Sequence, residues 1–121
     1  GSLVTHFGLN EFNEYKNAKT FKDGDIINMD ELEFRVIHTP GHTSGSVCFA
    51  VGDDMFTGDT LFARSIGRTD MPDGNISQMM SSLKKLASFN KNYNVYPGHM
   101  SATTLEYEKK YNPYMRGAFG D

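Results

Sequence analysis

The sequence predicts one domain of the α/β (α+β) class, in which short strands and helices alternate along the chain. Three observations support this prediction. The 121 residues suffice for one domain and are too few for two. Short apolar runs bounded by Gly, Asp and Pro indicate strands. One stretch, residues 76–87, instead repeats its apolar residues with the period of a helix.

The N-terminal part predicts a polar lead-in followed by a hairpin. Residues 1–20 are polar and weakly patterned. The runs 26–29 and 32–37 are predicted strands, and Asp30-Glu31 between them forms the turn. In the second strand Leu32, Phe34 and Val36 alternate with charged residues, which is typical of a strand with one buried face.

Three further strands are predicted from apolar runs. Residues 46–51 are apolar on both sides of the strand, which indicates a central position in the sheet. Residues 55–57 and 94–96 are shorter runs, and each ends at a glycine or at a proline followed by glycine. Residues 60–74 read as a long connection without regular structure, and such loops are often functional.

Two helices are predicted in the second half of the chain. The first begins after Asn75, and its apolar stripe consists of Ile76, Met79, Met80, Leu83, Leu86 and Ala87, with Lys84 and Lys85 on the solvent side. The residues Thr103-Thr104-Leu105-Glu106 fit a capping box at the start of the last helix. That helix is expected to end before Asn112-Pro113, because proline disfavours a helical predecessor.

Composition excludes several function classes. Lys+Arg 12 against Asp+Glu 15 gives a net charge of −3, which argues against a nucleic-acid-binding surface. No run of about 18 apolar residues is present, so no membrane partner is expected. The single cysteine, Cys48, lies inside an apolar run and is expected to be a buried thiol. One cysteine also excludes a disulfide within the chain and favours a cytoplasmic location.

A repeated pattern at strand ends indicates a metal site. Gly41-His42, Gly58-Asp59 and Gly98-His99 each follow a predicted strand, and glycine permits the sharp turn that directs the next side chain inward. Two imidazoles and a carboxylate suit zinc or iron better than magnesium or calcium. Taken singly, each residue would more often belong to an ordinary turn than to a metal site. The repetition favours His42, Asp59 and His99 as metal ligands.

The other histidines have weaker claims. His38 precedes His42 by four residues, but Pro40 between them excludes a helix and therefore a pair of ligands on one helical face. His38 is interpreted as a strand-end residue that supports a ligand without binding the metal. His6 is isolated and is expected to be solvated.

Four motifs resemble those of the metallo-beta-lactamase superfamily, and most closely its short glyoxalase II-like (hydroxyacylglutathione hydrolase-like) members. They are HTPGHTSGS at 38–46, FTGDTLF at 56–62, GRTD at 67–70 and YPGH at 96–99, and the likeness runs from about Phe21 to Pro113. That family folds as an αββα sandwich of two similar halves. The resemblance implies that this chain is the C-terminal half, a partial domain with a mixed sheet and helices on one face.

The resemblance also implies roles for individual residues. His42 would bind the first metal, His99 the second, and Asp59 would bridge both and position the metal-bound hydroxide that attacks the substrate. The complete site would hold two zinc ions, with iron or manganese as possible replacements. The implied reaction is hydrolysis of a thioester of the hydroxyacylglutathione type. Arg68 would hold the glutathione carboxylate, or alternatively form a surface salt bridge with Asp70 or Asp73.

The chain departs from the family pattern in ways that leave other functions open. The upstream HxHxDH motif is absent, the family's C-terminal helical domain is missing, and Ser101 replaces a glutathione-binding tyrosine. We therefore expect a truncated chain that is inactive alone and needs a missing N-terminal half. A mononuclear iron persulfide dioxygenase is one alternative. The other is a non-catalytic half-domain that associates with itself as a dimer or swapped assembly through an exposed apolar face.

Overall fold

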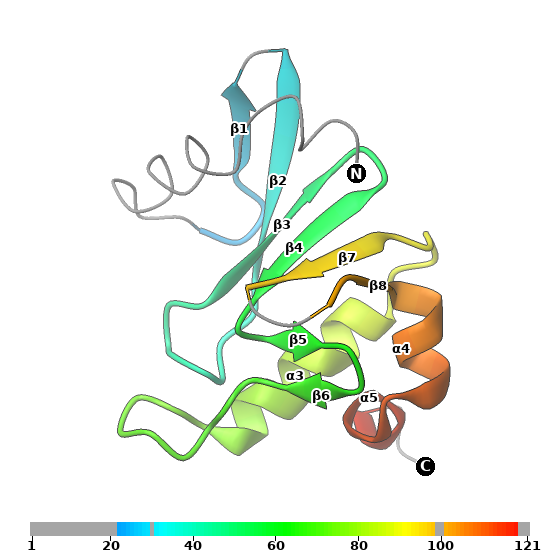
Figure 1. Cartoon of the computed structure of the whole chain (residues 1–121). Helices are drawn as coiled ribbons and strands as arrows, with labels where there is room; N and C mark the ends of the chain where they lie inside the picture. The colour runs from blue at the N-terminus through cyan, green and yellow to red at the C-terminus, as the bar shows by residue number, and fades with distance from the viewer. Residues whose placement is uncertain (1–21, 30, 99–100, 119–121) are drawn as a thin grey trace.

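The computed structural model describes residues 22–29, 31–98 and 101–118. Its main feature is a six-stranded mixed sheet in the order β1-β2-β3-β4-β7-β8 (Figure 1). These strands are β1 (Ile26–Met29), β2 (Leu32–His38), β3 (Val47–Val51), β4 (Asp54–Gly58), β7 (Asn94–Pro97) and β8 (Thr103–Thr104). Among the strand pairs of the described residues only β4–β7 is parallel, so the chain between these two strands must cross over from one end of the sheet to the other.

The predicted hairpin and central strand are confirmed. β1 pairs antiparallel with β2, and Phe34 and Val36 are buried while Glu33 and Arg35 are exposed. β3 lies between β2 and β4, and four of its five residues are buried, as expected for a strand covered on both faces. The side-chain alternation of the sequence therefore places the correct face of β2 against the core.

The connection at 60–74 contains regular structure, contrary to the sequence prediction. β5 (Leu61–Phe62) and β6 (Ser65–Ile66) form a small antiparallel hairpin. Arg64 in its turn has a left-handed backbone, with φ of 59°. Strands of two residues are too short to display a period of two, which is why the sequence pattern does not reveal them.

Helix α3 (Ile76–Ala87) begins and ends where the period predicts. Asn75 is its N-cap, and the Asn75 Oδ1 atom accepts the N–H of Gln78 at 2.9 Å. Met79, Leu83 and Leu86 of the predicted stripe are fully buried. Ile76 is an error in that stripe, because 54% of it is exposed at the first turn. The helical period predicts which face of α3 is apolar, but it does not predict how much of that face the sheet covers.

The C-terminal region holds two short helices rather than one. α4 (Leu105–Tyr111) ends before Pro113 as predicted, but its cap is Thr104, whose hydroxyl accepts the N–H of Tyr107 at 3.3 Å. Thr103 therefore belongs to β8 and not to the capping box. α5 (Pro113–Ala118) follows directly, and the sequence interpretation missed it. Proline is well tolerated at the first position of a helix, where its missing N–H has no partner to lose.

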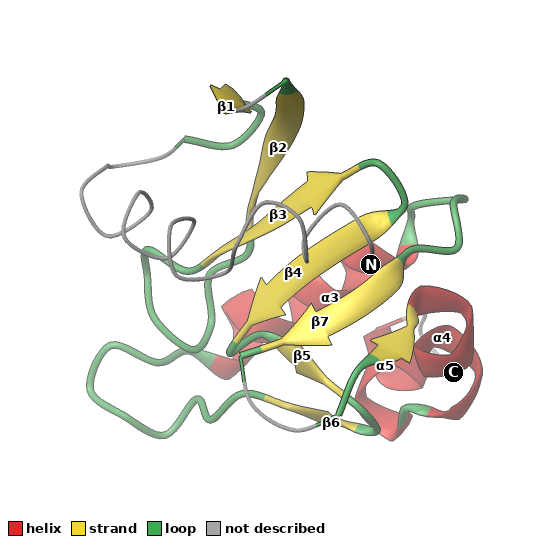
Figure 2. Ribbon diagram, turned by 45° about the horizontal axis from the view of Figure 1, so that its top comes forward, coloured by secondary structure: helices red, strands yellow, loops and turns green. Residues whose placement is uncertain are grey.

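Two apolar clusters lie on the two faces of the sheet. The first joins the sheet to all three described helices, and Figure 2 shows α3 behind β4 and β7, with α4 and α5 to one side next to β8. Its members include Ile37, Met55, Met79, Leu83, Val95, Leu105 and Met115. The second consists of Ile27, Phe34, Val36, Phe49 and Val51 and contains no residue of these helices. The predicted class, a mixed sheet with helices on one face, is confirmed.

None of the helices in the described part of the chain is both long and apolar enough to cross a membrane.

Candidate metal centre

The loop after β2 presents His42 because Gly41 lies directly on α3. A Cβ atom on Gly41 would stand 2.5 Å from the Cα atom of Met79, and the φ of Gly41 is +149°. The carbonyl oxygen of Gly41 accepts the N–H of Asn75 at 2.8 Å. Only glycine permits both this backbone angle and this close approach. The start of α3 therefore fixes the position from which the His42 side chain leaves the loop.

Asp59 follows β4 at the edge of the sheet where the parallel strands β4 and β7 both end. Gly58 has a left-handed backbone, with φ of 49°, which turns the chain out of the strand. The N–H of Gly98 donates to the carbonyl oxygen of Gly58 at 2.8 Å, and a Cβ atom on Gly98 would lie 3.5 Å from Asp59 Oδ1. The two strand ends are thus adjacent. His99 itself lies outside the described residues.

His42 and Asp59, two of the predicted ligands, face each other. Nε2 of His42 lies 3.6 Å from Oδ2 of Asp59. On the other side of the ring, Nδ1–H donates to the carbonyl oxygen of Arg68 at 2.8 Å, and this assignment holds because a carbonyl can only accept. The ring therefore presents Nε2 to the carboxylate of Asp59. A divalent cation placed between these two atoms would contact both of them.

The two donors fit a divalent metal ion. Ligands that bind one tetrahedral metal at about 2.1 Å stand about 3.4 Å apart, close to the separation observed between His42 and Asp59. A carbonyl that holds the distal ring nitrogen is also what metal-binding histidines commonly have. Within residues 22–29, 31–98 and 101–118 no cluster of three or more His, Cys, Asp or Glu side chains could hold a metal. The described residues thus supply a pair of donors.

Gly67 packs against both residues of this pair, although it was not predicted as a site residue. A Cβ atom there would lie 1.6 Å from the carbonyl oxygen of Asp59 and 3.4 Å from the Cβ atom of His42. The N–H of Gly67 donates to the carbonyl oxygen of Thr60 at 3.2 Å. Gly67 therefore brings the backbone of Arg68 against both predicted ligands. Its place before Arg68 in the GRTD motif was the available signal.

Arg68 contributes its backbone to the site, while its side chain pairs with Asp70. Nε of Arg68 lies 3.0 Å from Oδ1 of Asp70, and both side chains are highly exposed. This contact lowers the pKa of the Asp70 carboxyl and raises that of the guanidinium. Asp73, the other predicted partner, instead accepts the N–H and the hydroxyl of Ser44. The substrate-binding role of the Arg68 side chain stays a prediction.

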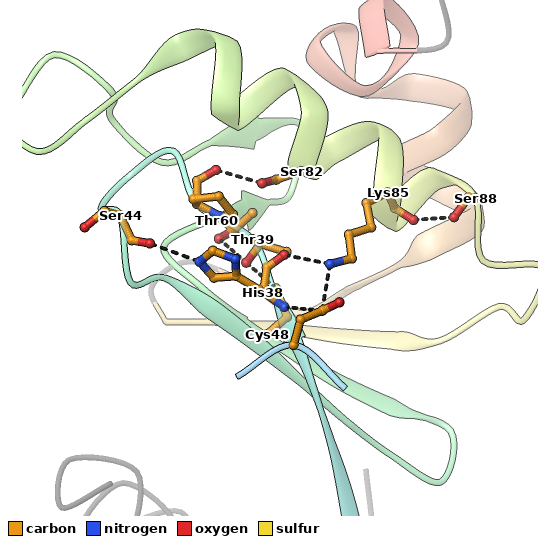
Figure 3. A network of polar contacts seen from close by, with 10 residues as sticks. His38, Thr39, Ser44, Cys48, Thr60, Ser82, Lys85 and Ser88 are labelled. Atoms are coloured by element: carbon orange, nitrogen blue, oxygen red, sulfur yellow. Dashed lines mark hydrogen bonds and ion pairs between the residues drawn. The ribbon is translucent and has the colours of Figure 1, made fainter. Parts of the chain in front are cut away.

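His38 lies at the end of β2 and belongs to a different polar network (Figure 3). Its Nε2 atom lies 3.0 Å from the carbonyl oxygen of Ser44, and its own carbonyl oxygen accepts the ammonium of Lys85 at 3.0 Å. Asp23 accepts both Lys85 Nζ and the N–H of His38, and these bonds lower the pKa of its carboxyl. His38 therefore connects the loop of His42 to α3, and Lys85 is not a purely solvent-facing residue.

Buried hydroxyls underlie the same loop. Thr39 is fully buried, and its Oγ1 atom lies 3.2 Å from Oγ1 of Thr60 and 3.4 Å from Sγ of Cys48 (Figure 3). Cys48 is fully buried, as predicted. These contacts join the loop before His42 to the residue that follows Asp59. No sequence pattern indicates the Thr39–Thr60 pair, because isolated threonines are common in strands and turns.

Comparison with known proteins identifies the family. Residues 6–99 match the model of the metallo-beta-lactamase superfamily, which is most of the chain. The chain belongs to this superfamily. The fold described above, a mixed sheet with helices on one face, agrees with that assignment and with the similarity to solved members.

Three relatives illustrate the range of similarity. A hydroxyacylglutathione hydrolase, GloC, of Haemophilus influenzae is 37% identical over 113 residues, which are 90% of this chain and 53% of that protein. The crystal structure of ETHE1 from Myxococcus xanthus superposes with a TM-score of 0.74 at 39% identity, covering 80% of this chain and 45% of that one. TTHA1623, solved in a di-iron-bound form, gives a TM-score of 0.70 at 37% identity, covering 79% and 48%. The chain thus spans about half the length of the relatives it matches.

Proposed function

We propose that this chain supplies one side of the active site of a metal-dependent thioester hydrolase. In this proposal His42 binds one metal ion, Asp59 bridges two, and His99 binds the second. The observation that carries the proposal is the 3.6 Å separation of His42 Nε2 and Asp59 Oδ2, with the distal ring nitrogen held by a carbonyl. A bound zinc ion would lower the pKa of water to about 7 and polarise a thioester carbonyl.

The protein groups have separate tasks in this proposal. The carbonyl of Arg68 fixes the ring of His42 so that Nε2 is presented to the metal. The packing of Gly67 on the Asp59 carbonyl and of Gly98 on Gly58 fixes the backbone from which the carboxylate leaves the chain. The Arg68 guanidinium, on the exposed side of the same loop, would receive an anionic group of the substrate in place of Asp70.

A thioester of glutathione is the proposed substrate class. Support comes from the 37% identity to a protein named hydroxyacylglutathione hydrolase, over 90% of this chain. The chain covers 53% of that relative, and a catalytic zinc normally has three protein ligands. We therefore propose that further ligands come from a second half of the site, and that the 121 residues alone turn over no substrate.

An iron enzyme is the second candidate, and its proposed activity is that of a mononuclear iron persulfide dioxygenase. The similarity to TTHA1623 in a di-iron-bound form supports iron as the metal but not the number of ions. The described donors, one imidazole and one carboxylate, suit either metal. Metal content and product therefore have to be measured together.

The test compares this chain with the protein encoded by its complete natural reading frame. Elemental analysis should find about two zinc ions in the latter, and that protein should hydrolyse S-lactoylglutathione. Asp59→Asn and His42→Gln should each remove metal and activity, while Glu33→Gln on the exposed face of β2 should change neither. Full metal occupancy in Asp59→Asn would contradict the assignment of Asp59. Iron content with sulfite production from a persulfide would establish the second candidate.

A further inference from the structure

A glutamate that is not among the predicted ligands is fully buried. Glu108 lies in α4 and is 0% exposed. Its Oε1 atom accepts the backbone N–H of Arg64 at 2.7 Å and the side-chain amide of Asn112 at 3.0 Å. Its Oε2 atom accepts the hydroxyl of Thr103 at 2.7 Å. All three donors are neutral, and a buried carboxylate is kept only where such bonds replace its hydration.

The donors on Oε1 hold the turn of the β5–β6 hairpin. Arg64 sits in that turn with φ of 59°, a conformation that non-glycine residues adopt rarely and only when their surroundings fix it. Asn112 binds Glu108 and also donates to the carbonyl oxygens of Phe62 and Ser65, one on each side of the turn. Glu108 and Asn112 together therefore attach the hairpin to α4, although Arg64 and Glu108 are 44 residues apart.

The hairpin in turn leads from one part of the candidate metal centre to the other. It begins just after Thr60, the neighbour of Asp59, and ends just before Gly67. The N–H of Gly67 donates to the carbonyl oxygen of Thr60, which closes the base of the hairpin. The next residue, Arg68, provides the carbonyl that accepts His42 Nδ1–H. The geometry of the turn thus determines where that carbonyl stands.

The donor on Oε2 connects the same carboxylate to β7, the strand that leads to Gly98. Thr103 belongs to β8 and pairs with Val95 of β7. β7 continues to Pro97, and Gly98 binds the carbonyl oxygen of Gly58. One carboxylate therefore holds the two segments, hairpin and β7–β8 pair, that flank Asp59.

We propose that Glu108 is a positioning residue for the candidate metal centre, an inference that rests on the function proposed above. It acts through the hairpin turn: it fixes Gly67 against Asp59 and presents the Arg68 carbonyl to His42. Its contribution is distinct from general stabilisation, because it reaches the site through defined hydrogen bonds, to the hairpin turn from Oε1 and to the β7–β8 pair from Oε2. Loss of the carboxylate should therefore loosen Gly67 and His42 more than an equally destabilising change elsewhere.

The test uses the 121-residue chain and compares Glu108→Gln with Val51→Ala. Val51 lies in the second apolar cluster and pairs with Asp54, at the opposite end of β4 from Gly58. Amide hydrogen exchange of Gly67 and the NMR signal of His42 Nδ1–H report on the site without any metal. Denaturant is used to bring both variants to the same global stability. Under these conditions the amide hydrogen of Gly67 should exchange at least about tenfold faster in Glu108→Gln than in Val51→Ala, and the His42 Nδ1–H signal should be weaker. In the protein from the complete reading frame, zinc affinity should fall about tenfold.

A milder variant keeps the proposal testable if Glu108→Gln does not fold. Thr103→Val removes one donor with little change of shape, and it should still speed Gly67 exchange relative to Val51→Ala at matched stability. Equal Gly67 exchange and an unchanged His42 signal in the Glu108 or Thr103 variant would overturn the proposal. Failure of the wild-type protein to bind zinc would instead reject the proposed function, because the exchange and NMR readouts do not depend on metal.

Discussion

Gly67 is packed against Asp59 so tightly that a Cβ atom would stand 1.6 Å from the Asp59 carbonyl oxygen. No side chain can occupy that space unless the backbone of one segment moves. A Cβ atom on Gly67 would also lie 3.4 Å from the Cβ atom of His42. The spacing of the two predicted ligands therefore depends on the absence of a side chain at this position.

Gly67→Ala should be strongly destabilising. Overpacking costs about 1–3 kcal/mol in well-packed sites, and here the clash is with backbone atoms that cannot rotate away. Gly45→Ala is the matched control, because nothing lies within 4 Å of its virtual Cβ atom, and its effect should stay within about 0.5 kcal/mol. Urea denaturation of both variants measures the difference. Equal stabilities would show that the Gly67 segment can move without cost.

Leu83→Ala should lower the free energy of unfolding by about 2–5 kcal/mol, because Leu83 is fully buried in the cluster that joins α3 to the sheet. Ile76→Ala in the same helix should change it by less than about 0.5 kcal/mol, since Ile76 is exposed. Denaturant unfolding followed by circular dichroism separates the two. A large effect of Ile76→Ala would indicate that this residue is covered in solution.

Asp23 should make stability depend on pH in acid. The hydrogen bond from Lys85 and the N–H of His38 lower its pKa below the ordinary value of 3.8. A lowered carboxyl pKa contributes stability that is present above the unfolded pKa and is lost as the pH falls through the folded value. The pair is partly exposed, so the contribution is at most about 1 kcal/mol.

The measurement for Asp23 is thermal unfolding of wild type and Asp23→Asn at several pH values. Their difference in stability should be constant above about pH 5 and should shrink towards zero below pH 3.8. Glu33→Gln changes the net charge equally on an exposed face and serves as the control. A difference that persists unchanged at low pH would mean that the aspartate acts through packing alone.

Arg68→Gln tests the proposed anion contact in the active enzyme. Loss of a charge-assisted hydrogen bond to substrate should raise KM by about 10-fold or more and leave kcat nearly unchanged. Asp70→Asn removes the partner that now holds the guanidinium, so KM should stay equal or fall. Steady-state kinetics with the thioester substrate measures KM and kcat of both variants. An unchanged KM in Arg68→Gln would leave the surface ion pair as the whole role of the side chain.

Elements with a clear side-chain period were predictable from sequence. The strand at 32–37 shows alternation, the strand at 46–51 is a continuous apolar run, and the helix at 76–87 follows helical spacing. His42 and Asp59, which each follow a glycine, lie 3.6 Å apart in the structure. The β5–β6 hairpin and α5 escaped because they are too short for a period to appear.

Contacts between distant segments were the least predictable part of the site. Gly67 and Glu108 matter through backbone groups that approach them in space, and no local pattern encodes such an approach. Glu108 nevertheless left one signal. It lies three residues after buried Leu105 and four before buried Asn112, so a carboxylate occupies a core position of α4.

The parallel pairing of β4 with β7 also bears on the order of events during folding. The hydrogen bond between Gly58 and Gly98 closes a loop that contains the entire crossover, including α3. Contacts of this kind close large loops, form slowly and contribute little until the rest of the chain is ordered. The hydrogen bond between His42 and the Arg68 carbonyl likewise closes a long loop, because the two residues are 26 residues apart. An unfolded chain therefore has no preformed place for a metal ion, and any ion that binds this site selects the completed fold.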